Sequence, residues 1–192
     1  KVRDEFRASD PEQPRLVFAD ILLPHLGPRA GEVALEMLDA GAARYFDLLG
    51  FNAPGYAAPP WVSSDEVAAN PQWGGHRFFA FRHVEDIRQI MVEKGVGDKQ
   101  IAILEMGWTT DPIHPAYSWF RVTEEQQAEY LVKAYEWARE HWAPWIGLMS
   151  MIYIADPDWT EEHEQYWWAI TLPSYPVTKT RPAYEALKAM PK

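Results

Sequence analysis

The sequence predicts an α/β fold in which four parallel strands alternate with four helices. Short apolar runs and stretches of helical periodicity follow one another along the 192 residues, as is typical of a parallel sheet covered by helices. Neither G-x-G-x-x-G nor G-x-x-x-x-G-K-[ST] occurs, so a nucleotide-binding doubly wound fold lacks its main signal. A (β/α)8 TIM barrel needs eight strand–helix units in about 250 residues. Because the chain supplies four units, we expect half of such a barrel.

The first two strands are predicted at residues 16–19 and 45–51. Both runs are largely apolar, as expected of buried strands in a parallel sheet. Between them, apolar residues recur at helical spacing, and Gly41 marks the C-terminal end of that helix. The segment 52–75 holds four prolines and is predicted to be a long loop. Loops of that length in compact domains usually have a function or are mobile.

The second half of the chain repeats the pattern. A helix is predicted at residues 77–94, and a strand follows at 101–104. Thr123–Gln126 reads as a capping box, in which the Thr and Gln side chains bind each other's backbone N–H groups, and it opens a long amphipathic helix. A fourth strand is predicted at 145–153 and a last helix at 181–190.

Composition and charge narrow the function classes. With 47% apolar and 14% aromatic residues, the chain can bury a substantial core, which excludes a disordered protein. No apolar run approaches 18 residues, so we expect no membrane partner. The chain has 28 Asp and Glu residues and 18 Lys and Arg residues, and the resulting net charge of −10 argues against a nucleic-acid partner. The absence of cysteine excludes disulfides and a cysteine nucleophile, and it does not indicate a compartment.

Candidate chemistry is expected at the carboxyl ends of the predicted strands, where barrels of this type place their active sites. Those ends carry Asp20, Asn52, Tyr56, Glu105, Trp108, Tyr153 and Asp156. Glu105 stands out because it directly follows the buried strand at 101–104. A carboxylate there must be hydrogen-bonded or ion-paired. The structural alternative is that Glu105 pairs with an Arg lining the barrel.

Two other kinds of chemistry are disfavoured. The seven lysines lie at termini, on helices or in loops, so none stands at a strand end for Schiff-base chemistry. The six histidines form no H-x-x-x-H pair, and no tight carboxylate cluster is expected at a strand end. The sequence therefore predicts neither a metal site nor a cofactor. His25 and His114 follow strands, so either could line the site.

Five segments resemble one family of barrel enzymes. Ile103–Trp108 resembles the (T/L)-E-(F/M)-G-(W/Y) end of the seventh strand in retaining (β/α)8 glycoside hydrolases, with family-39 and family-5-like members of the cellulase and β-xylosidase type the most similar. The four other segments follow the same order along the chain. They are Asp10–Val17 before the fifth strand, Ala40–Phe51 at the sixth, Val122–Leu131 in the helix after the seventh, and Arg181–Leu187 in the closing helix.

The resemblance implies that residues 1–192 are the C-terminal half of a single catalytic domain, with strands and helices 5–8. It makes Glu105 the nucleophile, which attacks the anomeric carbon and forms a covalent glycosyl-enzyme. A retaining mechanism needs a second carboxyl group about 5–5.5 Å away as acid/base. In these enzymes it belongs to an Asn-Glu motif at the end of the fourth strand, and the chain contains no Asn-Glu dipeptide. An N-terminal half must then supply it, or catalysis has been lost.

Substrate contacts are predicted for six residues, namely Asp20, Asn52, Tyr56, Trp108, Tyr153 and Trp159. Tyr56 would hydrogen-bond the nucleophile, with an aromatic lid contact as the alternative. Asn52 stands where the family usually has His. The two tryptophans and Tyr153 could stack on sugar rings or pack in the core. Asp20 could bind a substrate hydroxyl or cap a helix.

The leading hypothesis is a retaining glycosidase that acts on β-linked oligosaccharides or polysaccharides. The second is a carbohydrate-binding or vestigial half-barrel without catalysis. A third, an unrelated barrel enzyme such as an aldolase, lacks its Lys or metal. Because four open strands leave two edges and an uncovered inner face, we also expect the chain to associate with an N-terminal half-barrel chain or with itself.

Overall fold

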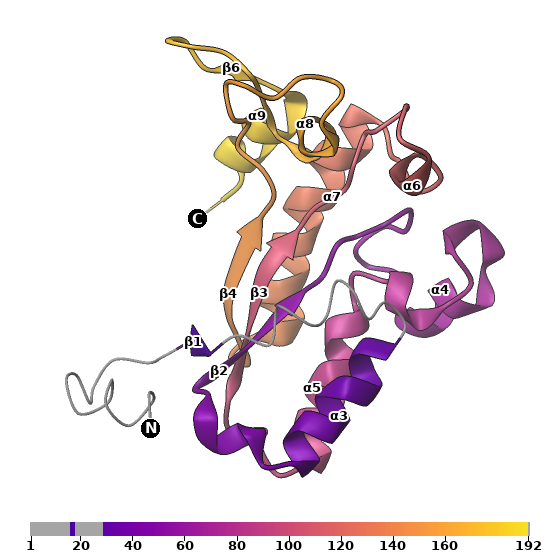
Figure 1. Ribbon diagram of the computed structural model, residues 1–192, viewed down its shortest axis with the longest axis vertical. Helices are drawn as coiled ribbons and strands as arrows, with labels where there is room; N and C mark the ends of the chain where they lie inside the picture. The colour runs from indigo at the N-terminus through magenta and orange to yellow at the C-terminus, as the bar shows by residue number, and fades with distance from the viewer. Residues whose placement is uncertain (1–15, 18–28, 192) are drawn as a thin grey trace.

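The computed structural model describes residues 16–17 and 29–191 (Figure 1). Its main sheet consists of β1 (Leu16–Val17), β2 (Leu48–Asn52), β3 (Gln100–Met106) and β4 (Ile146–Met151). The α-helices are α3 (Ala30–Asp39), α4 (Ser64–Ala69), α5 (His83–Glu93), α6 (Pro115–Ser118), α7 (Glu124–Trp137), α8 (Glu164–Trp168) and α9 (Pro182–Ala189). A small antiparallel pair, β5 (Thr171–Leu172) and β6 (Lys179–Thr180), lies between α8 and α9.

The main sheet has the strand order β1-β2-β3-β4, and each neighbouring pair is parallel. Sequential order with parallel pairing requires a crossover after each strand, and the helices supply these crossovers. The α/β fold with four parallel strands is therefore confirmed. All carboxyl ends point to one edge of the sheet, where α6 and α8 also lie (Figure 1).

The hydrophobic core lies between the sheet and the longer helices. Ile101 and Ile103 of β3 are fully buried against Ile87 of α5 and Leu131 of α7. Around this centre α3 packs on α5, and α7 packs on α9. β3 thus runs through the centre of the core, and it carries the strongest candidate residue at its carboxyl end.

Local signals end and begin the helices as predicted. Gly41 and Gly95, which follow α3 and α5, have φ of 81° and 72°, the left-handed conformation that glycine adopts without strain. The capping box at the start of α7 is confirmed, because the Thr123 side chain accepts from Gln126 N and the Gln126 side chain accepts from Thr123 N.

Several predicted boundaries are wrong. The expected loop 52–75 contains α4, whose own capping box joins Ser63 to Glu66. The helix expected from residue 77 begins at His83, since residues 77–79 form a separate 3-10 turn and Ala80 is extended. The expected strand 45–51 starts only at Leu48, after a 3-10 turn at 42–45.

The other departures lie at strand and helix ends. The expected strand 145–153 is shortened to β4, and the long helix that begins after Thr123 ends at Trp137 and is followed at 138–142 by a π-helical turn. Of the strand expected at 16–19, β1 covers 16–17, and residues 18–19 lie outside the described part. None of the helices within 29–191 is long and apolar enough to cross a membrane.

β4 differs from β3 in its burial. Gly147, Leu148 and Ser150 are exposed, and Leu148 retains 49% of its accessible surface. Ile146 and Met149 pack on the core from the other side. In the described residues β4 is an outer strand of the sheet, with one face on the helices and one face uncovered.

Candidate functional site

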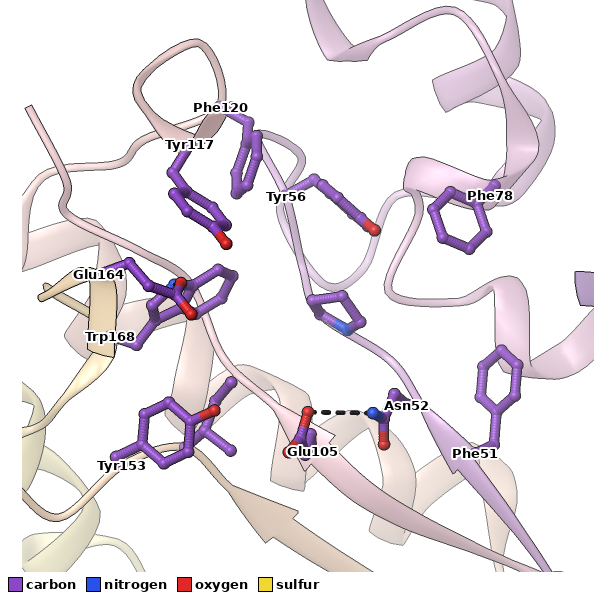
Figure 2. Close-up of a pocket in the computed structure, with 12 residues that line it drawn as sticks. Phe51, Asn52, Tyr56, Phe78, Glu105, Tyr117, Phe120, Tyr153, Glu164 and Trp168 are labelled. Atoms are coloured by element: carbon purple, nitrogen blue, oxygen red, sulfur yellow. Dashed lines mark hydrogen bonds between the residues drawn. The ribbon is translucent and has the colours of Figure 1, made fainter. Parts of the chain in front are cut away.

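A cavity of about 290 Å³ opens at the carboxyl ends of β2, β3 and β4 (Figure 2). Seven aromatic side chains and two carboxylates, Glu105 and Glu164, line it. In the described part of its wall there is no Lys, Arg or His. The aromatic rings and carboxylate acceptors in this part of the wall suit a ligand with both C–H faces and hydroxyl donors.

Glu105 and Asn52 meet because of an irregularity between β2 and β3. The strand register shifts between Phe51 and Asn52, and the shift places Asn52 opposite Glu105. Asn52 Nδ2 then donates to Glu105 Oε2 over 3.0 Å, as the dashed line in Figure 2 marks. The Oδ1 atom of Asn52 is buried and has no hydrogen-bond partner in the described structure. Asn52 therefore orients the carboxylate of Glu105 at the cavity wall.

Tyr153 follows β4 and lines the same cavity. Burial, and next the negative charges of Glu105 and Glu164, raise the pKa of its hydroxyl to about 12. The phenol therefore stays protonated at neutral pH and can donate a hydrogen bond. Trp159 packs edge-on against Tyr153 with ring centroids 5.4 Å apart, and it is not among the residues that line the cavity.

Tyr56 lies in the wall formed by the segment after β2. Its ring packs against Phe79 and Phe120, with centroids 4.9 and 5.0 Å away, and burial raises the pKa of its hydroxyl. Its φ of 47° is left-handed, an uncommon conformation for a residue other than glycine. The hydrogen bond predicted from Tyr56 to Glu105 stays a prediction.

The structure corrects the substrate contact predicted for Trp108. Its side chain is fully buried, packs on Phe81 and Tyr130, and donates from Nε1 to Ala58 O over 3.0 Å. A Cβ on Gly55 would lie 1.7 Å from the indole ring, so the chain passes directly over Trp108 there. A buried indole cannot stack on a sugar, and Trp108 has a packing role. Asp20 lies outside the described residues.

Glu164, Tyr117 and Trp168 line the cavity, and the sequence did not single them out. Glu164 is the first residue of α8, and its Oε2 accepts from Trp168 Nε1 over 3.1 Å. The Tyr117 hydroxyl also faces the cavity, and burial followed by the negative charge of Glu164 raises its pKa. The spacing Glu-x-x-x-Trp, one helical turn apart, is a signal that could have linked the first pair.

Two loops are tied together behind Glu164. His114 contacts Asp111 Oδ2 through Nδ1 over 2.7 Å, and it contacts Glu162 O through Nε2 over 3.1 Å. Thr110 Oγ1 donates to Trp167 O over 3.0 Å. These bonds join the segment after β3 to the segment after β4. His114, which we expected could line the site, instead supports it from outside the cavity wall, and His25 lies outside the described residues.

No group of three or more His, Asp and Glu side chains within the described residues is arranged to hold a metal ion. Lys99 stands at the opposite edge of the sheet, where its Nζ donates to Phe46 O over 2.8 Å. The chemistry that the cavity itself offers is that of carboxylates, an amide and phenols.

Comparisons with known proteins bear on the fold. The structure of a family 39 glycoside hydrolase from the gut symbiont Bacteroides cellulosilyticus WH2 matches with a TM-score of 0.60 and 16% identity, over 98% of this chain and 36% of that chain. A family 17 β-1,3-glucanosyltransferase from Rhizomucor miehei matches with a TM-score of 0.45 and 15% identity, over 83% and 56%. No protein-family model and no curated protein matches the chain. The chain thus has an α/β fold that is similar to part of a glycoside hydrolase structure, and it spans 36% of that structure's length.

Proposed function

We propose that this chain is the C-terminal half of the (β/α)8 catalytic domain of a retaining glycoside hydrolase, with Glu105 as its nucleophile. The observation that supports the proposal most is the position of Glu105. Its carboxylate stands at the carboxyl end of β3, a strand with fully buried residues, in the wall of an aromatic cavity, and is oriented by Asn52. Active sites of such barrels lie at this edge of the sheet.

In the proposed reaction Glu105 attacks the anomeric carbon of a β-linked sugar and forms a covalent glycosyl-enzyme. The glycosidic oxygen leaves with a proton from an acid/base carboxyl group, which then deprotonates the water that hydrolyses the intermediate. The hydrogen bond from Asn52 Nδ2 favours the ionised form of Glu105, because it stabilises negative charge on Oε2. The chain has no Asn-Glu dipeptide, so the acid/base comes from protein outside these 192 residues.

The exposed residues of β4 in the described part of the sheet support the proposed missing half. Leu148 of β4 is half exposed, and β4 is an outer strand within the described sheet. Closing a parallel sheet into a barrel pairs both outer strands and buries such side chains. We therefore infer that an N-terminal half-barrel, on the same or a separate polypeptide, or failing that a second copy of this chain, covers this face. Light scattering that finds a monodisperse 22.1 kDa monomer with a cooperative melt would contradict this inference.

The test of the proposal is Glu105→Gln in the complete assembly. Turnover of aryl β-glycosides should fall by about 10⁴ or more, as when a nucleophile is removed from other enzymes. In Glu105→Ala, which leaves space where the carboxylate stood, added azide should restore release of the aryl group, because a small external nucleophile can replace the missing carboxylate. Glu161→Gln, at an exposed carboxylate before α8, is the control and should keep full activity. Undiminished turnover in Glu105→Gln would refute the nucleophile assignment.

A non-catalytic carbohydrate-binding protein is the second candidate, and the lack of an Asn-Glu dipeptide favours it. Intact mass and gel analysis of the isolated material separate the two candidates. A second polypeptide, or a longer chain carrying an Asn-Glu strand end, supports the hydrolase. A single species near 22.1 kDa that binds sugars without turnover supports the binding protein.

A further inference from the structure

We propose that Trp119 forms a second sugar-binding position at the rim of the cavity, where its indole stacks on a pyranose unit of a β-linked oligosaccharide that extends out of the cavity. This inference rests on the proposed function, because it names the length of substrate that the same site takes. It is carried by the exposure of Trp119, by the rings that hold it and by the place of those rings in the cavity wall.

Trp119 differs from the core tryptophans in its exposure. It directly follows α6, at the edge of the sheet to which the carboxyl ends of the strands point (Figure 1). Trp119 retains 48% of its accessible surface, whereas Trp108 and Trp142 retain at most 1%. An aromatic ring in contact with water stabilises a complex when the apolar face of a ligand covers it.

Three other aromatic rings hold the indole of Trp119 in place. Phe120 and Phe79 pack edge-on against it, with ring centroids 4.9 and 5.4 Å away. The ring of Tyr56 lies nearly parallel to the indole, at an angle of 24° and a centroid distance of 6.5 Å. These neighbours come from two segments, one after β2 and one after β3. A ring that is already fixed in this way loses little entropy when a ligand packs on it.

Two of these rings connect Trp119 to the cavity. Tyr56 and Phe120 both line the cavity, and they lie side by side in its wall with centroids 5.0 Å apart (Figure 2). Tyr56 also has the left-handed φ of 47°, and such backbone strain is concentrated at binding sites, where the surrounding packing maintains it. The indole of Trp119 therefore continues the aromatic wall of the cavity to an exposed rim.

The size of the cavity favours a ligand that continues beyond it. The part that the described residues form holds about 290 Å³, just below the roughly 300–1,000 Å³ of small-molecule pockets. In β-linked glucose and xylose the ring hydroxyls are equatorial, so both faces of the ring carry axial C–H groups. Such a face packs on an indole without the help of a charged group. Trp119 is thus suited to an additional unit of either kind of chain.

The test measures how affinity depends on the length of the oligosaccharide, in the protein as isolated and with Glu105→Gln in all samples to prevent hydrolysis. Calorimetric titration gives the Kd of two β-linked disaccharides, cellobiose and xylobiose, and of cellotetraose and xylotetraose. The parent should bind the tetrasaccharides about tenfold more tightly than the disaccharides. Trp119→Ala should abolish this gain and change the disaccharide Kd by less than twofold. Trp119→Phe, which keeps a smaller ring, should retain a gain of about threefold.

Trp61→Ala is the matched control. Trp61 is 40% exposed, but it packs edge-on against Tyr130, a buried ring of α7, with centroids 5.6 Å apart. Its removal should leave all four Kd values unchanged. Urea unfolding of Trp119→Ala checks that the variant is folded, so that a loss of affinity reports on the indole.

The inference is overturned if the parent binds tetrasaccharides no more tightly than disaccharides, or if Trp119→Ala leaves the gain intact. It is also overturned if Trp119→Ala weakens both lengths equally, since the indole would then belong to the cavity itself. If Trp119→Ala instead prevents co-purification of a second polypeptide and leaves the gain intact, the indole belongs to an interface between half-barrels. None of these outcomes requires Glu105 to lose its role, which the turnover of Glu105→Gln in the complete assembly tests separately.

Discussion

Two aromatic clusters, one in the core and one around the cavity, differ in what surrounds their polar atoms. The core cluster consists of Phe81, Trp108, Tyr130 and Trp142. The cavity cluster consists of Tyr56, Tyr117, Phe120, Tyr153 and Trp168. The members of the core cluster are at most 6% exposed, whereas the three tyrosines of the cavity cluster remain partly accessible.

Their polar atoms show why the clusters have different roles. In the core cluster both indole N–H groups are used inside the protein, by Ala58 O for Trp108 and by Glu85 Oε1 for Trp142. In the cavity cluster phenol hydroxyls face a space that also holds two carboxylates. Aromatic content alone therefore does not separate a ligand cavity from a core, whereas polar groups that point into a shared space do.

The largest effect that separates the clusters is expected from Trp108→Ala. Removal of a fully buried indole leaves a cavity in the core, and the free energy of unfolding should fall by about 3–5 kcal/mol. Urea unfolding with linear extrapolation measures the loss. Trp119→Ala is the control, because Trp119 is 48% exposed and should lose less than half as much. Equal losses would show that Trp108 is not a core residue.

A smaller effect is expected from Tyr153→Phe, which should weaken binding and leave the stability nearly unchanged. The change keeps the ring and removes a hydroxyl that faces the cavity, so the free energy of unfolding should change by less than about 1 kcal/mol. The Kd for cellobiose should rise about threefold to tenfold with the loss of one hydrogen bond. Unchanged binding together with a loss of stability like that of Trp108→Ala would place Tyr153 in the core cluster.

The sequence predicted the sheet and the position of Glu105 because both depend on local signals. Apolar runs, glycine stops and the Thr123 capping box lie within a few residues of the elements that they define. The error at Trp108 had a local signal as well. Successive side chains of a strand point to opposite faces, so if Glu105 faces the cavity, Met106 and Trp108 face the core. The structure has both of them fully buried.

The sequence could not predict the other wall of the cavity. Glu164 and Tyr117 lie 47 residues apart, in segments after different strands, and they meet only because of side-chain bonds between those segments. α8 is five residues long, which is too short for a helical periodicity to be recognised. Short segments placed by tertiary contacts are therefore where sequence reasoning missed functional candidates.

The smallest effect concerns His114, which joins the two segments behind the cavity cluster. Asp111 Oδ2 and Glu162 O both accept hydrogen bonds, so the imidazole satisfies both with its two N–H groups only when it is protonated. The bond to Asp111 accordingly raises the pKa of His114 above its ordinary value of about 6.5. A raised pKa in the folded state means that the stabilisation is complete below about pH 6.5 and is lost as the pH rises through the folded-state value.

We therefore expect affinity for cellobiose and resistance to urea to decline together as the pH rises through the folded-state pKa of His114. Glu162 then loses its hydrogen bond to the imidazole, and Glu162 lies two residues before Glu164 of the cavity wall. His114→Asn, which cannot titrate, should flatten the decline and leave the core cluster unaffected. The decline is measured from the Kd for cellobiose and the urea midpoint of the wild type and of His114→Asn between pH 5 and 9, the range in which histidine changes charge. If the wild-type decline persisted in His114→Asn, the coupling between this histidine and the cavity would be refuted, and the two clusters would differ in polarity without differing in their response to pH.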